Sequence, residues 1–198
     1  MKKICILYLY ASIGLFQAAA QQNLIWDIQL LKGSNHEVVP YSQTITTESG
    51  QGLYVVINPA SDCFCYVISQ NSERKMVILY DQAVKGGNEI SLNPLQADNS
   101  PGTVTLYIIM SLARQTKLED FIKNYKSSPS SQRYANNLHG EIARLQDTVS
   151  GLGEPASVII ASGGTTRGQN STQEYVTRFS ERNIYVRAIT IRTAPAVP

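Results

Sequence analysis

The chain of 198 residues has few of the residues that build metal sites, disulfide frameworks and membrane spans. It contains three cysteines, two histidines and one tryptophan. After residue 20 no apolar run approaches the roughly 18 residues that a membrane-spanning helix needs. Only 16% of the residues are charged. These scarcities argue against a cysteine-rich scaffold, a helical membrane protein and a polyelectrolyte.

The chain also has almost no net charge. The net charge is +2, and Lys2 and Lys3 account for it, so the rest of the chain carries as many basic as acidic side chains. Nucleic acids and anionic membrane surfaces attract proteins with a strongly basic field. We therefore expect neither of them as the natural partner. With 43% hydrophobic residues the chain is long enough to bury a core as one globular domain.

The first twenty residues have the pattern of a secretory signal peptide. Two lysines are followed by an apolar run over residues 4–16 and by the small residues Ala18, Ala19 and Ala20. We expect cleavage after Ala20, which leaves one β-rich domain over residues 21–198. An uncleaved membrane anchor is the alternative. Export to the periplasm, the outer-membrane periphery or the medium follows from cleavage, and the short lysine-containing head is typical of bacteria.

Four segments predict β-strands most strongly: residues 53–57, 63–69, 75–80 and 103–111. A spacing of about ten residues favours antiparallel hairpins. Residues 63–69 and 75–80 are apolar on both faces, which places them in the middle of a packed sandwich. In residues 103–108 Thr103, Thr105 and Tyr107 alternate with apolar residues, so this strand should have one wet and one dry face. Residues 23–31 indicate a first strand, and residues 38–47 an edge strand.

The hydrophobic period then changes to that of two helices. Thr116 and Glu119 form a capping-box pattern before an apolar stripe that includes Ile122 and Tyr125. Ser128-Pro129 is expected to start a second helix, which ends at Gly151. Strands return at residues 156–161 and 184–191. The chain therefore predicts an α+β, mainly β, fold: an antiparallel β-sandwich-like domain with two helices inserted before the C-terminal strands.

After the expected cleavage only Cys63 and Cys65 remain. In a strand the two thiols point to the same face, about 6.5–7 Å apart, which is too far for an unstrained disulfide. We interpret them as buried thiols. A thiol or metal site is the sharper alternative, and in that case zinc or copper would raise the melting temperature through Cys63.

No arrangement of residues in the sequence matches a known catalytic motif. His36 and His139 are isolated, no Gly-x-Ser-x-Gly or phosphate-binding loop occurs, and we expect no cofactor, no metal ligand and no catalytic residue. Residues 161–168 form a glycine-rich loop in which Arg167 could help to bind an anion. A plain connection between strands is the alternative. The alternative hypothesis is that the protein is a secreted hydrolase or carbohydrate-active enzyme that uses paired carboxylates such as Asp62 and Asp81.

Tyrosine is abundant, with 11 residues, and supplies large contact area at a low entropic cost. Tyr41, Tyr54, Tyr107 and Tyr175 are the candidates for an exposed binding surface, together with Arg167. Packing against a neighbour is the alternative for each tyrosine.

Residues 50–112 carry a series of turn and strand motifs: Asn58-Pro59, Asp62 before Tyr66-Val67-Ile68, Met76-Val77 before Leu79-Tyr80, Asn88 before Ile90, Pro94, and Pro101-Gly102-Thr103 before Leu106-Tyr107-Ile108-Ile109. This series resembles a bacterial family catalogued as domain of unknown function 4384. Asp81 stands where members commonly have proline. The resemblance implies an exported or envelope-associated domain, sometimes joined to kinase or caspase-like peptidase modules, and it assigns no catalytic residue. Residues 179–191 are similar to the closing strand of spirochaete-type members.

From these observations we expect an exported, non-catalytic binding or assembly module of the bacterial cell envelope. Its partner would be another envelope protein or a surface ligand.

Overall fold

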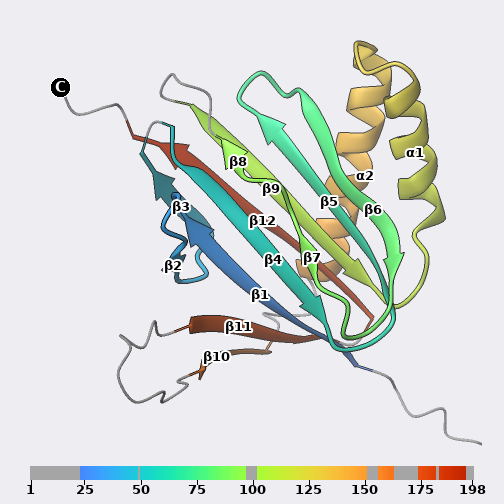
Figure 1. The fold of residues 1–198 in the computed structure, drawn as a ribbon. Coiled ribbons are helices and arrows are strands. Elements are labelled where there is room, and N and C mark those ends of the chain that lie inside the picture. Colours follow the sequence, from blue (N-terminus) through green and yellow to red (C-terminus); the bar gives the residue numbers. More distant parts are fainter. Residues whose placement is uncertain are drawn as a thin grey trace, which may run out of the picture.

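Two β-sheets pack face to face, and two helices cover the outer face of one of them (Figure 1). The computed structural model describes residues 23–48, 50–96, 102–150, 156–162, 174–181 and 183–194. In the part it describes, strands dominate and the two helices precede the last three strands. The predicted fold class is therefore confirmed. The expected signal peptide and the glycine-rich loop with Arg167 lie outside the described residues.

One sheet has seven strands among the described residues, and its central pair is antiparallel from Trp26 opposite Pro59 to Lys32 opposite Leu53. Its inward side chains alternate with half-exposed ones along both central strands, as expected for a sheet with one buried face. The strands in order are β10 (Ala156–Ser162), β11 (Glu174–Glu181), β1 (Leu24–Lys32), β4 (Gly52–Pro59) and β7 (Ile90–Ser91), with β2 (Glu37–Val39) on β1 and β8 (Leu95–Gln96) on β4.

The other sheet has five strands, and it lies between the seven-stranded sheet and the helices. Its strands in order are β3 (Thr44–Thr47), β12 (Ile184–Thr193), β9 (Thr103–Ser111), β5 (Cys63–Asn71) and β6 (Met76–Val84). The segment expected as one edge strand over residues 38–47 is thus two short strands in different sheets. The prediction that residues 75–80 form a central strand is wrong, because β6 forms the edge of its sheet.

Side chains of the five-stranded sheet alternate between two separate cores. Cys65 and Ile108 face the seven-stranded sheet, whereas Tyr66, Tyr107 and Ile109 face the helices. The expectation of a wet face on residues 103–108 is therefore wrong for Tyr107, which is only 7% exposed. The alternation in sequence is real, but the helices cover the face that it marks as polar.

The helices α1 (Thr116–Ser127) and α2 (Gln132–Ser150) bury the apolar stripes that the sequence predicts, with Leu118, Ile122 and Tyr125 on α1. The predicted capping box is wrong: the N-cap is Gln115, and no side chain caps it. The backbone N–H of Gln115 donates instead to the hydroxyl of Tyr66, and that hydroxyl donates to the carboxylate of Glu119 at 2.8 Å. A contact with the sheet has replaced the local cap. Neither helix, in the described part of the chain, has the length and apolar character to cross a membrane.

A buried carboxylate fastens the two helices together. Glu141 of α2 is 3% exposed, and it lies 2.8 Å from Lys117 of α1 and 2.6 Å from Arg144. Burial alone would raise the pKa of Glu141, but hydrogen bonds from Arg144 and Lys117 outweigh it and hold the pKa below its ordinary value of 4.5. Since the folded-state pKa is depressed, the stabilisation is present above pH 4.5 and is lost as the pH falls through the folded-state value.

Glu141→Gln should lower the free energy of unfolding by about 1–3 kcal/mol at pH 7, because it removes the charge from a hydrogen-bonded network. The difference between wild type and variant should shrink as the pH falls from neutral to 3. Urea denaturation followed by the fluorescence of Trp26, the only tryptophan, measures both effects. The exposed carboxylate of Glu37 provides the control, since Glu37→Gln should change stability little at any pH. A difference for Glu141→Gln that is independent of pH would contradict this account.

Candidate binding cleft

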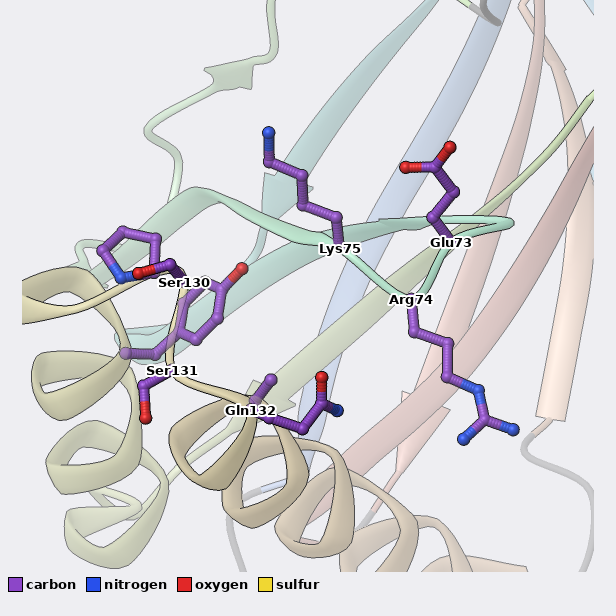
Figure 2. A pocket seen from close by; sticks show the side chains of 9 residues that line it. Glu73, Arg74, Lys75, Ser130, Ser131 and Gln132 are labelled. Atoms are coloured by element: carbon purple, nitrogen blue, oxygen red, sulfur yellow. The ribbon is translucent and has the colours of Figure 1, made fainter.

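A cleft of about 480 Å³ lies between two turns that are far apart in the sequence (Figure 2). One is the turn of the β5–β6 hairpin, and the other joins α1 to α2. The lining combines charged, amide and hydroxyl groups with apolar surface: Glu73, Arg74, Lys75, Tyr125, Pro129, Ser130, Ser131, Gln132 and Ala135.

Tyr125 joins the two sides of the cleft. Its ring is buried in the core under the helices, and its hydroxyl accepts a hydrogen bond from the backbone N–H of Met76 at 3.2 Å. The same hydroxyl donates to the carbonyl oxygen of Met76 at 2.9 Å. Met76 begins the edge strand β6, so this tyrosine satisfies both backbone groups of one edge residue. The helix pair is thereby fixed to the start of the strand.

The hairpin side of the cleft is a rigid turn. The backbone N–H of Asn71 donates to the carbonyl of Lys75, and the N–H of Arg74 donates to the carbonyl of Asn71, both at 3.0 Å. The side-chain oxygen of Asn71 also accepts from the N–H groups of Glu73 and Lys75. Arg74 has φ 63°, in the left-handed region that glycine normally occupies. A side chain there costs roughly 1 kcal/mol, so stability alone does not explain an arginine at this position.

The helical side of the cleft is a tight connection that begins at the end of α1. The N–H of Ser128 donates to the carbonyl of Tyr125, and the N–H of Ser131 donates to the carbonyl of Ser128. Pro129 lies within this turn and fixes its own φ. The sequence predicted a helix start at Ser128-Pro129, whereas α2 begins at Gln132. The three extra turn residues are what form this wall.

Three charged residues line the cleft in the described part of the chain, Glu73, Arg74 and Lys75, and of these Arg74 is directed to the side of the hairpin where α2 lies. In the view of Figure 2 Glu73 and Lys75 project from the opposite side of the hairpin. Ser130 and Gln132 add exposed hydrogen-bonding groups on the opposite wall. The arrangement suits a polar ligand with negative charge, because guanidinium, ammonium, hydroxyl and amide groups all donate hydrogen bonds.

The tyrosines predicted as a binding surface have different roles. Tyr107 is buried under the helices, and its hydroxyl donates to Gln70 at 3.1 Å, so its predicted exposure is wrong. Tyr41 is half-buried, and its hydroxyl lies 3.1 Å from that of Tyr185. Its ring packs at 5.0 Å against Phe179 in the core. Both residues need their phenol groups for packing, which was the alternative interpretation.

Tyr54 lies on the outer face of the seven-stranded sheet. It is half-exposed and lines a separate hollow of about 270 Å³. Tyr175 belongs to β11 by its backbone, which pairs with Ala161, but its side chain lies outside the described residues, as does Arg167. The structure therefore does not bring these predicted residues together with the cleft.

Both cysteines are buried and free, as predicted from their spacing. They lie in the core between the sheets, and burial, together with Asp62, raises the pKa of Cys63 to about 11. Burial also raises the pKa of Cys65. Both thiols therefore stay protonated near neutral pH. In the described part of the chain no three histidine, cysteine or acidic side chains are grouped so as to hold a metal ion.

The paired carboxylates Asp62 and Asp81 have separate partners. Asp62 accepts a hydrogen bond from the N–H of Gly86 at 2.9 Å, and Asp81 forms an ion pair with Lys126 at 2.7 Å. Asp81 lines a hollow of about 590 Å³ together with Glu119, but Asp62 does not. Glu119 is itself paired with Arg114 at 2.6 Å. Asp120 also lines this hollow, so two of the three carboxylates among its described lining residues, Asp81 and Glu119, are held in ion pairs.

Sequence reasoning missed the cleft residues. It assigned Tyr125 to the apolar stripe of the first helix and Lys75 to a strand, and it did not single out Arg74. The one indication in the sequence was the hydroxyl of Tyr125, because a buried tyrosine needs a hydrogen-bond partner.

Comparison with models of protein families, with curated proteins and with solved structures found no match to the chain. The family resemblance stays a prediction.

Tyr125→Phe should lower the free energy of unfolding by about 1–3 kcal/mol, because the N–H and C=O of Met76 both lose their partner. Chemical denaturation measures the loss. Tyr134→Phe is the matched control on α2, where the ring is only half-buried, and it should change stability by less than about 0.5 kcal/mol. Equal effects of the two substitutions would show that Tyr125 does not join the walls of the cleft.

Proposed function

We propose that this protein is an exported, non-catalytic binding or assembly module of the bacterial cell envelope, and that its partner protein places acidic groups in the cleft between the hairpin and the helix turn. The observation that carries this proposal is a cleft whose two walls are each fixed by hydrogen bonds and joined to each other through Tyr125. A preformed site loses little conformational entropy when it binds.

The charge of the cleft supports an acidic partner. The guanidinium of Arg74 is directed to the side of the hairpin where α2 lies, and Ser130 is exposed on the facing wall. Charged groups at such a rim act mainly on the rate and the specificity of association. Binding that depends on them weakens as ionic strength rises, because salt screens exposed charges.

The N-terminal sequence supports export. An apolar run after Lys2 and Lys3 ends in the small residues that precede Gln21, which is the pattern of a cleaved leader. The resemblance of residues 50–112 to an envelope-associated bacterial family points to the same compartment.

The cleft is tested by a photo-crosslinking amino acid introduced at Ser130 in the full chain, expressed in the native cell. We expect it to capture one defined partner, whereas the same group at the exposed Asn137, outside the cleft lining, should not capture that partner. Capture should fall as salt is raised. Equal capture from both positions would contradict the proposal.

Arg74→Gly is a variant that should lose binding of the acidic partner while it keeps the fold. Glycine readily adopts the left-handed φ of this position, so relief of strain and loss of chain entropy nearly cancel, and stability should change by less than about 1 kcal/mol. Capture should nevertheless fall about tenfold, because the guanidinium is gone. Arg133→Ala removes an exposed positive charge outside the cleft lining and should leave capture unchanged. Undiminished capture by Arg74→Gly would refute an acidic partner at this site.

Export makes a separate prediction. Mass spectrometry of the N-terminal peptide of the native protein, recovered from the cell envelope or the medium, should show a chain that starts at Gln21. A chain recovered from the cytoplasm with Met1 and its leader intact would contradict export while leaving the crosslinking result to stand by itself.

A further inference from the structure

The hollow of about 270 Å³ on the seven-stranded sheet, lined by Tyr54, differs in chemistry from the cleft. It lies where the turn between β1 and β2 meets the chain before β4. Its lining combines the ring of Tyr54 with the side chains of Ser34, Asn35 and Gln51, and the remaining surface comes from three glycines and Pro94. We propose that this hollow binds a ring of a neutral saccharide. The proposal does not rest on the function proposed for the cleft.

The two sides of the hollow are joined directly. The N–H of Gly33 donates to the carbonyl of Gly52 at 3.0 Å, and the N–H of His36 donates to the carbonyl of Gly33. Gly33 and Gly50 have φ of 70° and 81°, which side chains rarely adopt. A Cβ at Gly50 would meet no atom within 4 Å, so that glycine borders open space. Glycines here leave the peptide groups of the turn accessible to a ligand.

Tyr54 is held in a fixed orientation. The ring of His36 packs against it at a centroid distance of 4.7 Å, with the two planes at 77°. His36 has φ 53°, so the backbone of a residue other than glycine is kept in a costly conformation beside this tyrosine. In the described part of the chain His36 and Arg74 are the two residues other than glycine with positive φ; Arg74 lines the cleft, and His36 follows Asn35 of this hollow.

The chemistry of the lining selects the class of ligand. Among the described residues, no side chain that is charged at neutral pH lines the hollow, so an ionic ligand would find no counter-charge there. A hydroxyl and two amides offer both donors and acceptors, and an aromatic ring offers an apolar face. Gln51 is already oriented, because its amide nitrogen donates to Glu48 at 2.9 Å and its oxygen accepts from the backbone N–H of Glu48. A sugar ring has the matching pattern of hydroxyl groups around an apolar face.

The test uses cellotriose, maltotriose and chitotriose as probes, titrated into the isotopically labelled full chain and followed by amide chemical shifts. At least one should bind with a dissociation constant on the order of 1 mM, and the shifts should centre on Gly33, Asn35, Gln51 and Gly52. Trigalacturonic acid, an anionic probe of similar size, should bind at least tenfold more weakly. Absence of shifts at these amides with all three neutral probes would overturn the proposal, as would tighter binding of the anionic probe.

Variants separate stacking from general effects on the fold. Tyr54→Ala should weaken binding of the best probe about tenfold or more, whereas Tyr54→Phe, which keeps the ring, should bind within about threefold of wild type. Gln51 lies outside the strands, so Gln51→Ala should leave the fold intact. It should weaken binding several-fold even if Tyr54→Ala is poorly folded. Arg74→Gly should leave saccharide binding unchanged. Wild-type affinity in Gln51→Ala, or in folded Tyr54→Ala, would show that the site lies elsewhere.

Discussion

The side chains of the five-stranded sheet enter two separate cores, and this burial on both faces is the constraint that the rest of the structure satisfies. Leu106 and Ile108 pack against the seven-stranded sheet, whereas Ile109 and Val186 pack against the helices. A sheet in this position needs apolar side chains in both directions along its central strands. The same sheet then sets the positions of everything attached to its ends, including the hairpin turn that forms one wall of the cleft.

Tyrosine hydroxyls connect the buried sheet to the helices. Tyr66 and Tyr125 have buried rings, and their hydroxyls are bonded across this boundary, to Glu119 and Gln115 and to Met76 respectively. Tyr107 is also buried, and its hydroxyl joins two strands of the sheet through Gln70. A buried hydroxyl without a partner is costly, so these bonds fix the positions of the elements as well as contributing stability. Much of the tyrosine content that suggests a binding surface therefore serves packing. The cleft is a consequence of this network, because Tyr125 fixes the distance between the hairpin and the helix turn.

Local patterns predicted the elements well, and they failed where contacts between distant segments decide the outcome. Periodicity was sufficient for the fold class, for both helices and for the burial of Cys63 and Cys65. It could not show that β6 forms an edge, since an apolar run does not tell whether a strand is paired on one side or on both; in the structure β6 is only partly buried, and Val77 is 52% exposed. It could not show that Tyr107 is buried, because Thr103 and Thr105 on the same side of the strand mark a polar face, which the helices cover at Tyr107. The cap of α1 moved to Gln115 because Tyr66, about fifty residues earlier in the chain, provides the hydrogen bond.

The cleft was beyond sequence reasoning for the same reason. Arg74 and Ser131 are far apart in the chain and meet only because the hairpin and the helix connection extend from the same doubly covered sheet. Hydrogen exchange of backbone amides in the free protein tests most directly whether these walls are preformed. The account predicts that the amides of Met76 and Ser131 are protected to a degree approaching that of the β5 amides. Exchange of both at the rate of an open chain, while β5 stays protected, would contradict it.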